Sequence, residues 1–192
     1  MNKLILFISL FFPISFFGQG LDFSQLSDGF YKDHIEVLAN SPSLKPQEMY
    51  LKSGVSGGKF NPEADIYYVK RDSNLLRLDY SDYFGYVKSG VFYWNYKGDF
   101  YRLGMVGMLS HVIVTETVIN TNSAIGPYSS TQQIPLVVHF KTGQSFAFEP
   151  EPLEAFLMEN DYELYKEFSA IKKRKEKRRM MFYYLRKYNE RF

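Results

Sequence analysis

The stretch VFYWNYKGDFYRLGMV, residues 91–106, predicts a β-hairpin, and with it the class of fold. β-Branched and aromatic side chains fill both of its arms, and such side chains favour extended strands. Lys97-Gly98 or Gly98-Asp99 supplies the tight turn, because glycine accepts the positive φ that a two-residue hairpin turn requires.

Further segments of the same composition surround this hairpin. They are residues 49–52, 65–71, 75–80, 83–87, 110–120, 134–140 and 144–149. Short turn signals separate most of them, and Lys141-Thr142-Gly143 joins the last two as a second hairpin. Residues 53–64 and 120–133 are rich in Gly, Pro, Ser and Asn and predict longer loops. Strands in runs with short turns favour an antiparallel sheet that is curled or barrel-like.

Helices are expected at both ends of the strand-rich region. Asp33–Ala39 reads as a short helix that stops before Pro42, because the residue before proline avoids the α region. Pro152 suits the first turn of a helix that runs to Glu159. Asn160 or Asp161 can cap a long C-terminal helix. The sequence therefore predicts an α+β fold, divided into residues 1–20, a β-rich domain 21–160 and a charged helix 161–192.

The predicted C-terminal helix has an unusual stripe. Positions at helical spacing along it are Leu164, Phe168, Ile171, Lys175, Arg178, Phe182, Leu185 and Asn189. The stripe is apolar, then basic, then apolar again. Because charged side chains are buried only when paired, we expect this helix to leave the body near residue 171 or to cross an acidic surface there.

The first twenty residues are typical of an export signal. Lys3 provides a positive start, residues 4–17 are almost entirely apolar, and Gly18-Gln19-Gly20 provides small residues for cleavage after Gly18 or Gly20. The apolar run is shorter than the roughly 20 residues of a membrane-spanning helix. We therefore predict a periplasmic or secreted protein, with no transmembrane span once the signal has been removed.

Composition and charge limit the function classes further. The chain has no cysteine, which excludes disulfides, a lipoprotein anchor on cysteine, and cysteine-based metal or nucleophilic sites. The net charge of +2 is the sum of two regions of opposite charge. Residues 166–192 carry eleven basic side chains against three acidic ones, whereas residues 19–165 carry eleven basic and 18 acidic ones. An acidic body thus carries a basic tail, which is a statement about partners and not about fold.

The basic charge is concentrated in KKRKEKRR, residues 172–179. Its seven basic residues are Lys172, Lys173, Arg174, Lys175, Lys177, Arg178 and Arg179. Three interpretations stay open: a solvated helix face, a site for an anionic surface such as membrane headgroups, lipopolysaccharide or anionic glycan, and docking on an acidic patch of this protein or of a partner. Nucleic acid is not expected as a partner of an exported protein.

Aromatic side chains give a second candidate site. In residues 91–96, Trp94 lies on one face of the strand with Tyr96, while Tyr93 lies on the other. Exposed rings here could stack on sugars or other flat ligands. The alternative is cross-strand aromatic packing inside the core.

No pattern predicts catalysis, a cofactor or a metal. Ser56 lies in a G-x-S-x-G match, but the residues after Gly58 do not begin the helix that a hydrolase nucleophile requires. His34, His111 and His139 form no metal-ligand pair by spacing. Two acidic groups, Asp79 with Asp82 and Glu149 with Glu151 and Glu154, could be paired carboxylates, although surface positions explain them as well.

Three segments resemble a family of small exported proteins of Gram-negative bacteria. They are DGFYKDHIEVLANSP (28–42), GVFYWNYKGDFYRLGMVG (90–107) and the ending ENDYELYKEF…YLRKYNERF. The resemblance implies one domain ending in a charged helix, and it carries over no catalytic residue. Residues 53–64 depart from the family pattern and read as an insertion.

Together these observations predict an exported, non-catalytic envelope or secreted module that binds or scaffolds. A β domain with an aromatic sugar or lipid site is the second hypothesis, and a hydrolase is the third.

Overall fold

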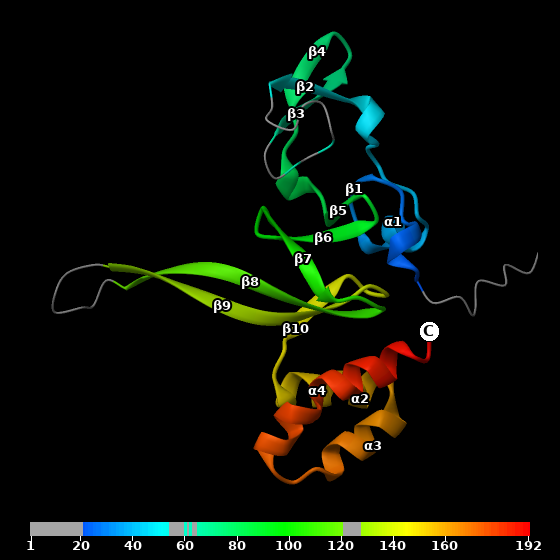
Figure 1. The fold of residues 1–192 in the computed structure, drawn as a ribbon, viewed down its shortest axis with the longest axis vertical. Helices are drawn as coiled ribbons and strands as arrows, with labels where there is room; N and C mark the ends of the chain where they lie inside the picture. Colours follow the sequence, from blue (N-terminus) through cyan, green and yellow to red (C-terminus); the bar gives the residue numbers. More distant parts are fainter. Residues whose placement is uncertain (1–20, 54–59, 61, 63–64, 121–127) are drawn as a thin grey trace, which may run out of the picture.

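The computed structural model describes residues 21–192 except 54–59, 61, 63–64 and 121–127, and it has an α+β fold (Figure 1). The expected fold class is confirmed. The strands are β1 (Gly29–Tyr31), β2 (Met49–Ser53), β3 (Ile66–Arg71), β4 (Asn74–Arg77), β5 (Gly85–Lys88), β6 (Val91–Tyr96), β7 (Asp99–Met105), β8 (Leu109–Asn120), β9 (Tyr128–His139) and β10 (Gln144–Ala147). Residues 1–20, predicted to be an export signal, and Ser56 lie outside the described residues.

Seven strands form one curled antiparallel sheet in the order β1-β5-β6-β7-β8-β9-β10. The predicted hairpin of residues 91–106 is its centre: β6 pairs with β7, and Tyr96 lies opposite Asp99. Lys97 and Gly98 have φ values of 54° and 93°, as a two-residue turn with two positive φ angles requires. The sheet is a half-barrel rather than a closed barrel.

The remaining strands form a small sheet in the order β2-β3-β4, at the opposite end of the molecule from the C-terminal helices (Figure 1). Aromatic side chains join it to the main sheet: Phe30, Tyr67 and Tyr86 are buried in one cluster. Residues 75–80 were expected to be one strand. Instead β4 ends at Arg77, and the 3-10 helix η3 (Tyr80–Asp82) follows, with the side chain of Asp79 accepting a hydrogen bond at its start.

β8 and β9 form a hairpin that projects from the body (Figure 1). Their pairing runs from Leu109 opposite His139 to Asn120 opposite Tyr128. Residues 128–133 were predicted as loop, so this part of the prediction is wrong. The polar segment is rich in Ser, Thr and Gln, and it becomes a strand because β8 offers a continuous partner along its whole length.

Both faces of the sheet are covered, because side chains alternate along each strand. On one face, Val112, Val114 and Val138 pack with Phe23 and Tyr31 from the N-terminal segment. That segment contains η1 (Phe23–Gln25) and the predicted short helix α1 (His34–Leu38), which Asp33 caps by accepting a hydrogen bond from the Glu36 N–H. The 3-10 helix η2 (Pro46–Glu48) leads into β2.

Three helices cover the other face: α2 (Pro150–Asn160), α3 (Tyr162–Ala170) and α4 (Arg174–Asn189). Leu153 and Leu157 of α2 pack with Leu185 of α4 and with Val137 of the sheet in one buried cluster. The helix expected from Pro152 to Glu159 is α2, which begins at Pro150 and ends at Asn160.

The C-terminal segment is two helices, not the single long helix that its stripe predicted. Asp161 caps α3 as expected, accepting a hydrogen bond from the Leu164 N–H at 3.1 Å. The backbone then becomes extended at Ile171 and Lys173, and α4 begins. A continuous helix would be about 40 Å long at 1.5 Å per residue. It would carry the second apolar patch away from the body, whereas the break lets that patch be buried.

Candidate functional site

Helix α4 begins with ion pairs to α2. Arg174 forms two contacts with Glu151: Nε lies 2.8 Å from Oε1, and Nη2 donates to Oε2 at 3.1 Å. Arg178 Nη2 lies 2.8 Å from Glu149 Oε2, and Lys177 pairs with Glu154. The hydrogen bond from Arg174 holds the pKa of the Glu151 carboxyl below its usual value. Glu151 and Glu154 of α2, and Glu149 at its start, are thus ion-pair partners, and we name Arg174, Lys177 and Arg178 the α2-paired set.

The other predicted basic residues differ in their surroundings. Lys173 lies 3.5 Å from Glu176 of its own helix. Lys172, Lys175 and Arg179 are exposed and make no ion pair with any residue that the structure describes. Docking on an acidic patch of this protein therefore fits three of the seven basic residues. For the other four, a solvated helix face and a site for an anionic surface both remain open.

A stripe of exposed side chains runs along the outside of α4. Lys175, Arg179, Phe182 and Arg186 follow one another at spacings of four, three and four residues, which places them on one face of the helix. Phe182 is 39% exposed and Tyr183 is 46% exposed. Like Lys175 and Arg179, Arg186 forms no ion pair within the described part of the chain. We name Lys175, Arg179 and Arg186 the outer-face set.

Neighbouring side chains contact the rings of Phe182 and Tyr183. The Phe182 ring centroid lies 4.7 Å from that of Phe148 and 4.9 Å from that of His111. Lys187 Nζ lies 5.5 Å from the centre of the Tyr183 ring and pairs with Glu167 of α3. The outer face of α4 thus combines exposed aromatic edges with cations on a helix that is fixed to the body.

The predicted aromatic face is not one surface. Tyr93 stacks on Tyr86 with ring centroids 4.7 Å apart and belongs to the cluster beside the small sheet. Trp94 is 5% exposed and lies in the buried cluster with Phe23 and Val112. Tyr96 packs against Trp94 at 5.6 Å and donates a hydrogen bond to Glu116 at 2.7 Å. Cross-strand packing therefore accounts for Tyr93 and Trp94, and Tyr96 alone borders a surface hollow.

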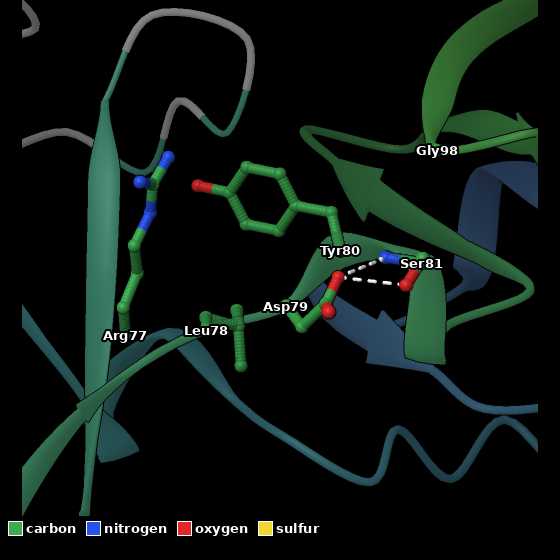
Figure 2. A pocket seen from close by; sticks show the side chains of 6 residues that line it. All are labelled: Arg77, Leu78, Asp79, Tyr80, Ser81 and Gly98. Carbon is green, nitrogen blue, oxygen red and sulfur yellow. Dashed lines mark hydrogen bonds between the residues drawn. The ribbon is translucent and has the colours of Figure 1, made fainter.

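A hollow of about 430 Å³ lies between η3 and the β6–β7 turn (Figure 2). Figure 2 shows the Arg77 guanidinium beside the Tyr80 ring, and the Asp79 carboxylate bonded to Ser81. Asp79 accepts from the Ser81 N–H at 3.0 Å and from its hydroxyl at 2.7 Å, and these bonds lower the pKa of Asp79. Tyr80 donates its hydroxyl to the Asp65 carbonyl at 2.7 Å. Asp79 therefore caps the start of η3.

The histidines on the helix-covered face of the sheet serve packing. Burial lowers the pKa of His111, and it lowers that of His139 to about 4, with smaller contributions from Lys141 and His34. His139 Nε2 lies 3.2 Å from the Tyr188 hydroxyl, whose pKa burial raises to about 12. Within the described residues, no group of three or more His, Asp or Glu side chains is arranged to hold a metal ion.

Comparison of the chain with protein-family models, curated proteins and solved structures finds no match in any of the three. The resemblance to exported proteins of Gram-negative bacteria therefore stays a prediction. In the described part of the chain, no helix is both long enough and apolar enough to span a membrane.

Two parts of the candidate site were missed by sequence reasoning. Arg186 was counted in the tail charge but was not assigned to a site, because it lies outside the basic run. The division of the run between α2 and the outside depends on how α2 and α4 cross, and helical periodicity within α4 contains no information about α2. A register count along α4 alone would, however, have grouped Arg186 with Lys175 and Arg179.

Proposed function

We propose that the protein is an exported, non-catalytic module that attaches to an anionic envelope surface through the outer face of α4. One observation carries this proposal: the cations of α4 are divided into two sets. The α2-paired set is neutralised by Glu149, Glu151 and Glu154. The outer-face set has no acidic partner in the described structure and is available to an external anion.

The chemistry of the outer face suits a membrane or lipopolysaccharide surface. Basic residues near an anionic surface contribute about 1 kcal/mol each. Phe182 and Tyr183 lie between these cations, 39% and 46% exposed, and aromatic rings favour the headgroup region of a bilayer. Three cations and two ring edges are enough for reversible attachment, and salt weakens it because the Debye length is about 8 Å at physiological ionic strength.

Charge and targeting support the same proposal. Residues 19–165 carry a net charge of −7, so an anionic surface repels the body and attracts the C-terminal helices. Attachment would therefore be oriented, with α4 toward the surface. The predicted export signal in residues 1–20 would deliver the protein to the envelope of a Gram-negative cell, where phospholipid headgroups and lipopolysaccharide supply anions.

Co-sedimentation with vesicles tests this proposal. The wild-type protein, without residues 1–20, is mixed with vesicles that contain phosphatidylglycerol, and with phosphatidylcholine vesicles as the uncharged reference. Two triple variants are matched in charge: Lys175→Gln/Arg179→Gln/Arg186→Gln removes the outer-face set, and Arg174→Gln/Lys177→Gln/Arg178→Gln removes the α2-paired set. We expect binding to anionic vesicles at low salt and release at high salt.

The two variants should behave in opposite ways. The outer-face variant should lose vesicle binding and keep the wild-type melting temperature. The α2-paired variant should melt at a lower temperature, because Glu149, Glu151 and Glu154 are left without partners, and should keep most of its binding. Equal loss of binding in both variants would mean that only net charge matters. Failure of the wild-type protein to sediment with anionic vesicles would disprove the proposal.

A further inference from the structure

β7 and β8 separate after a short region of pairing. They pair only where Leu103 lies opposite Val112 and Met105 opposite His111, whereas β8 continues to pair with β9 as far as Asn120. Beyond that point the Tyr101 hydroxyl reaches across and donates to the Thr115 carbonyl at 3.0 Å. The divergence leaves a hollow of about 350 Å³, lined by Tyr96, Lys97, Asp99, Tyr101, Thr115, Glu116 and Thr117.

The Glu116 carboxylate in this hollow is fixed in position. Its Oε1 accepts hydrogen bonds from the Tyr96 hydroxyl at 2.7 Å and from Lys97 Nζ at 2.6 Å. Both bonds fall on the same oxygen, and Oε2 accepts none from the residues that the structure describes. Asp99 supplies a second carboxylate without a described partner. Charged acceptors such as these form short, strong hydrogen bonds with hydroxyl donors.

Aromatic rings form part of the lining beside the carboxylates. Tyr96 and Tyr101 are half-buried, and Tyr96 is supported from below by Trp94, which is buried in the core. The lining therefore presents ring surface next to hydrogen-bond acceptors, with one cation against two carboxylates. Such a surface disfavours an anion, and it offers too many polar groups for a purely apolar ligand.

We propose that this hollow binds a neutral carbohydrate, with sugar hydroxyls donating to Glu116 and Asp99 and a sugar ring packing on Tyr96 or Tyr101. The arrangement follows the general pattern of small-molecule sites, in which a few fixed polar groups orient a ligand against aromatic walls. The hollow contains residues of β6, the β6–β7 turn, β7 and β8 and none of α4. The proposal therefore stands independently of attachment to an anionic surface.

Tryptophan fluorescence tests this proposal directly, because Trp94 is the only tryptophan in the sequence and its ring lies 5.6 Å from that of Tyr96. The folded protein is titrated with maltotriose, cellotriose and chitotriose, and with glucuronate as an anionic reference. We expect a saturable change with at least one neutral trisaccharide, with a Kd on the order of 1 mM, and no such change with glucuronate.

Three variants locate the binding. Glu116→Gln should weaken binding about tenfold, as expected for the loss of a hydrogen bond to a charged group, and it should leave the fold intact because the glutamine oxygen can still accept from Tyr96 and Lys97. Tyr101→Ala should also weaken it, and circular dichroism checks its fold. Asp79→Asn, in the hollow of Figure 2, should leave binding unchanged. The absence of saturation with all three neutral sugars, equal binding by wild type and Glu116→Gln, or tighter binding of glucuronate would each overturn the proposal.

Discussion

The stability of this fold should depend on pH through His139, the last residue of β9. His139 is 2% exposed and lies between the sheet and the helices, with its ring 4.9 Å from that of Phe156. Its Nδ1 lies 3.1 Å from the Thr142 hydroxyl, and its Nε2 lies 3.2 Å from the Tyr188 hydroxyl. Burial, with Lys141 and His34 nearby, lowers the pKa of His139 from 6.5 to about 4.

This pKa shift sets both the direction and the pH range of the effect. The folded protein holds His139 neutral, whereas the unfolded chain takes up a proton as the pH falls below 6.5. The free energy of unfolding therefore decreases as the pH falls from about 6.5 to about 4 and changes no further from this group below that range. One pKa unit corresponds to about 1.4 kcal/mol, so the full loss is about 3 kcal/mol, most of which is reached by about pH 4.5.

Urea unfolding of wild type and His139→Gln, at about pH 7 and about pH 4.5, measures this loss. Glutamine keeps a polar group for Tyr188 and Thr142 but does not titrate. The loss between the two pH values should be smaller in the variant by about 2 kcal/mol. His111, whose pKa burial also lowers, acts in the same direction and cancels in the comparison. The same loss in both proteins would refute the assignment to His139.

Two further predictions concern other parts of the chain. Asn189 accepts from the Leu109 N–H at 2.7 Å and donates to the Leu109 carbonyl at 2.9 Å, so Asn189→Ala should reduce the free energy of unfolding by about 2 kcal/mol; an unchanged urea midpoint would show that this link between α4 and β8 is dispensable. Protein recovered from the periplasm or medium should have an intact mass that lacks residues 1–20 or 1–18, and a mass that includes Met1 would contradict the predicted signal.

Local chemistry made the centre of the sheet predictable. The hairpin of residues 91–106 combines β-forming side chains with a glycine turn, and the structure confirms it as β6 and β7. A short helix follows Asp33 where one was expected, and Asp161, one of the two predicted caps, begins α3. In each case the deciding interactions join residues within a few positions of one another, and such interactions can be inferred from the sequence.

The parts that were not predicted depend on contacts between distant segments. Residues 128–133 look like a loop by composition and become a strand only because β8 lies beside them. The break at Ile171–Lys173 contains no proline or glycine. It is favoured by the burial of Met181, Leu185 and Tyr188 in the cluster with α2 and the sheet. The spacing of apolar residues predicts neither the strand at residues 128–133 nor the break at residues 171–173. The spacing along a helix is the same whether the chain continues straight or turns back.

The break also explains how one basic run can have two roles. In a single straight helix, Lys175 and Arg178 fall on the stripe that includes Phe168 and Leu185, so both would face the core. The extended residues Ile171 and Lys173 instead let α4 pack as a separate helix. Arg178 then reaches Glu149, Lys177 lies over the Phe168 ring at 5.2 Å, and Lys175 turns outward. The same change buries Leu185 and leaves Phe182 at the edge of the core. Removing the α2-paired set should therefore weaken the packing of α4 against α2, whereas the outer-face set can be altered without changing that packing.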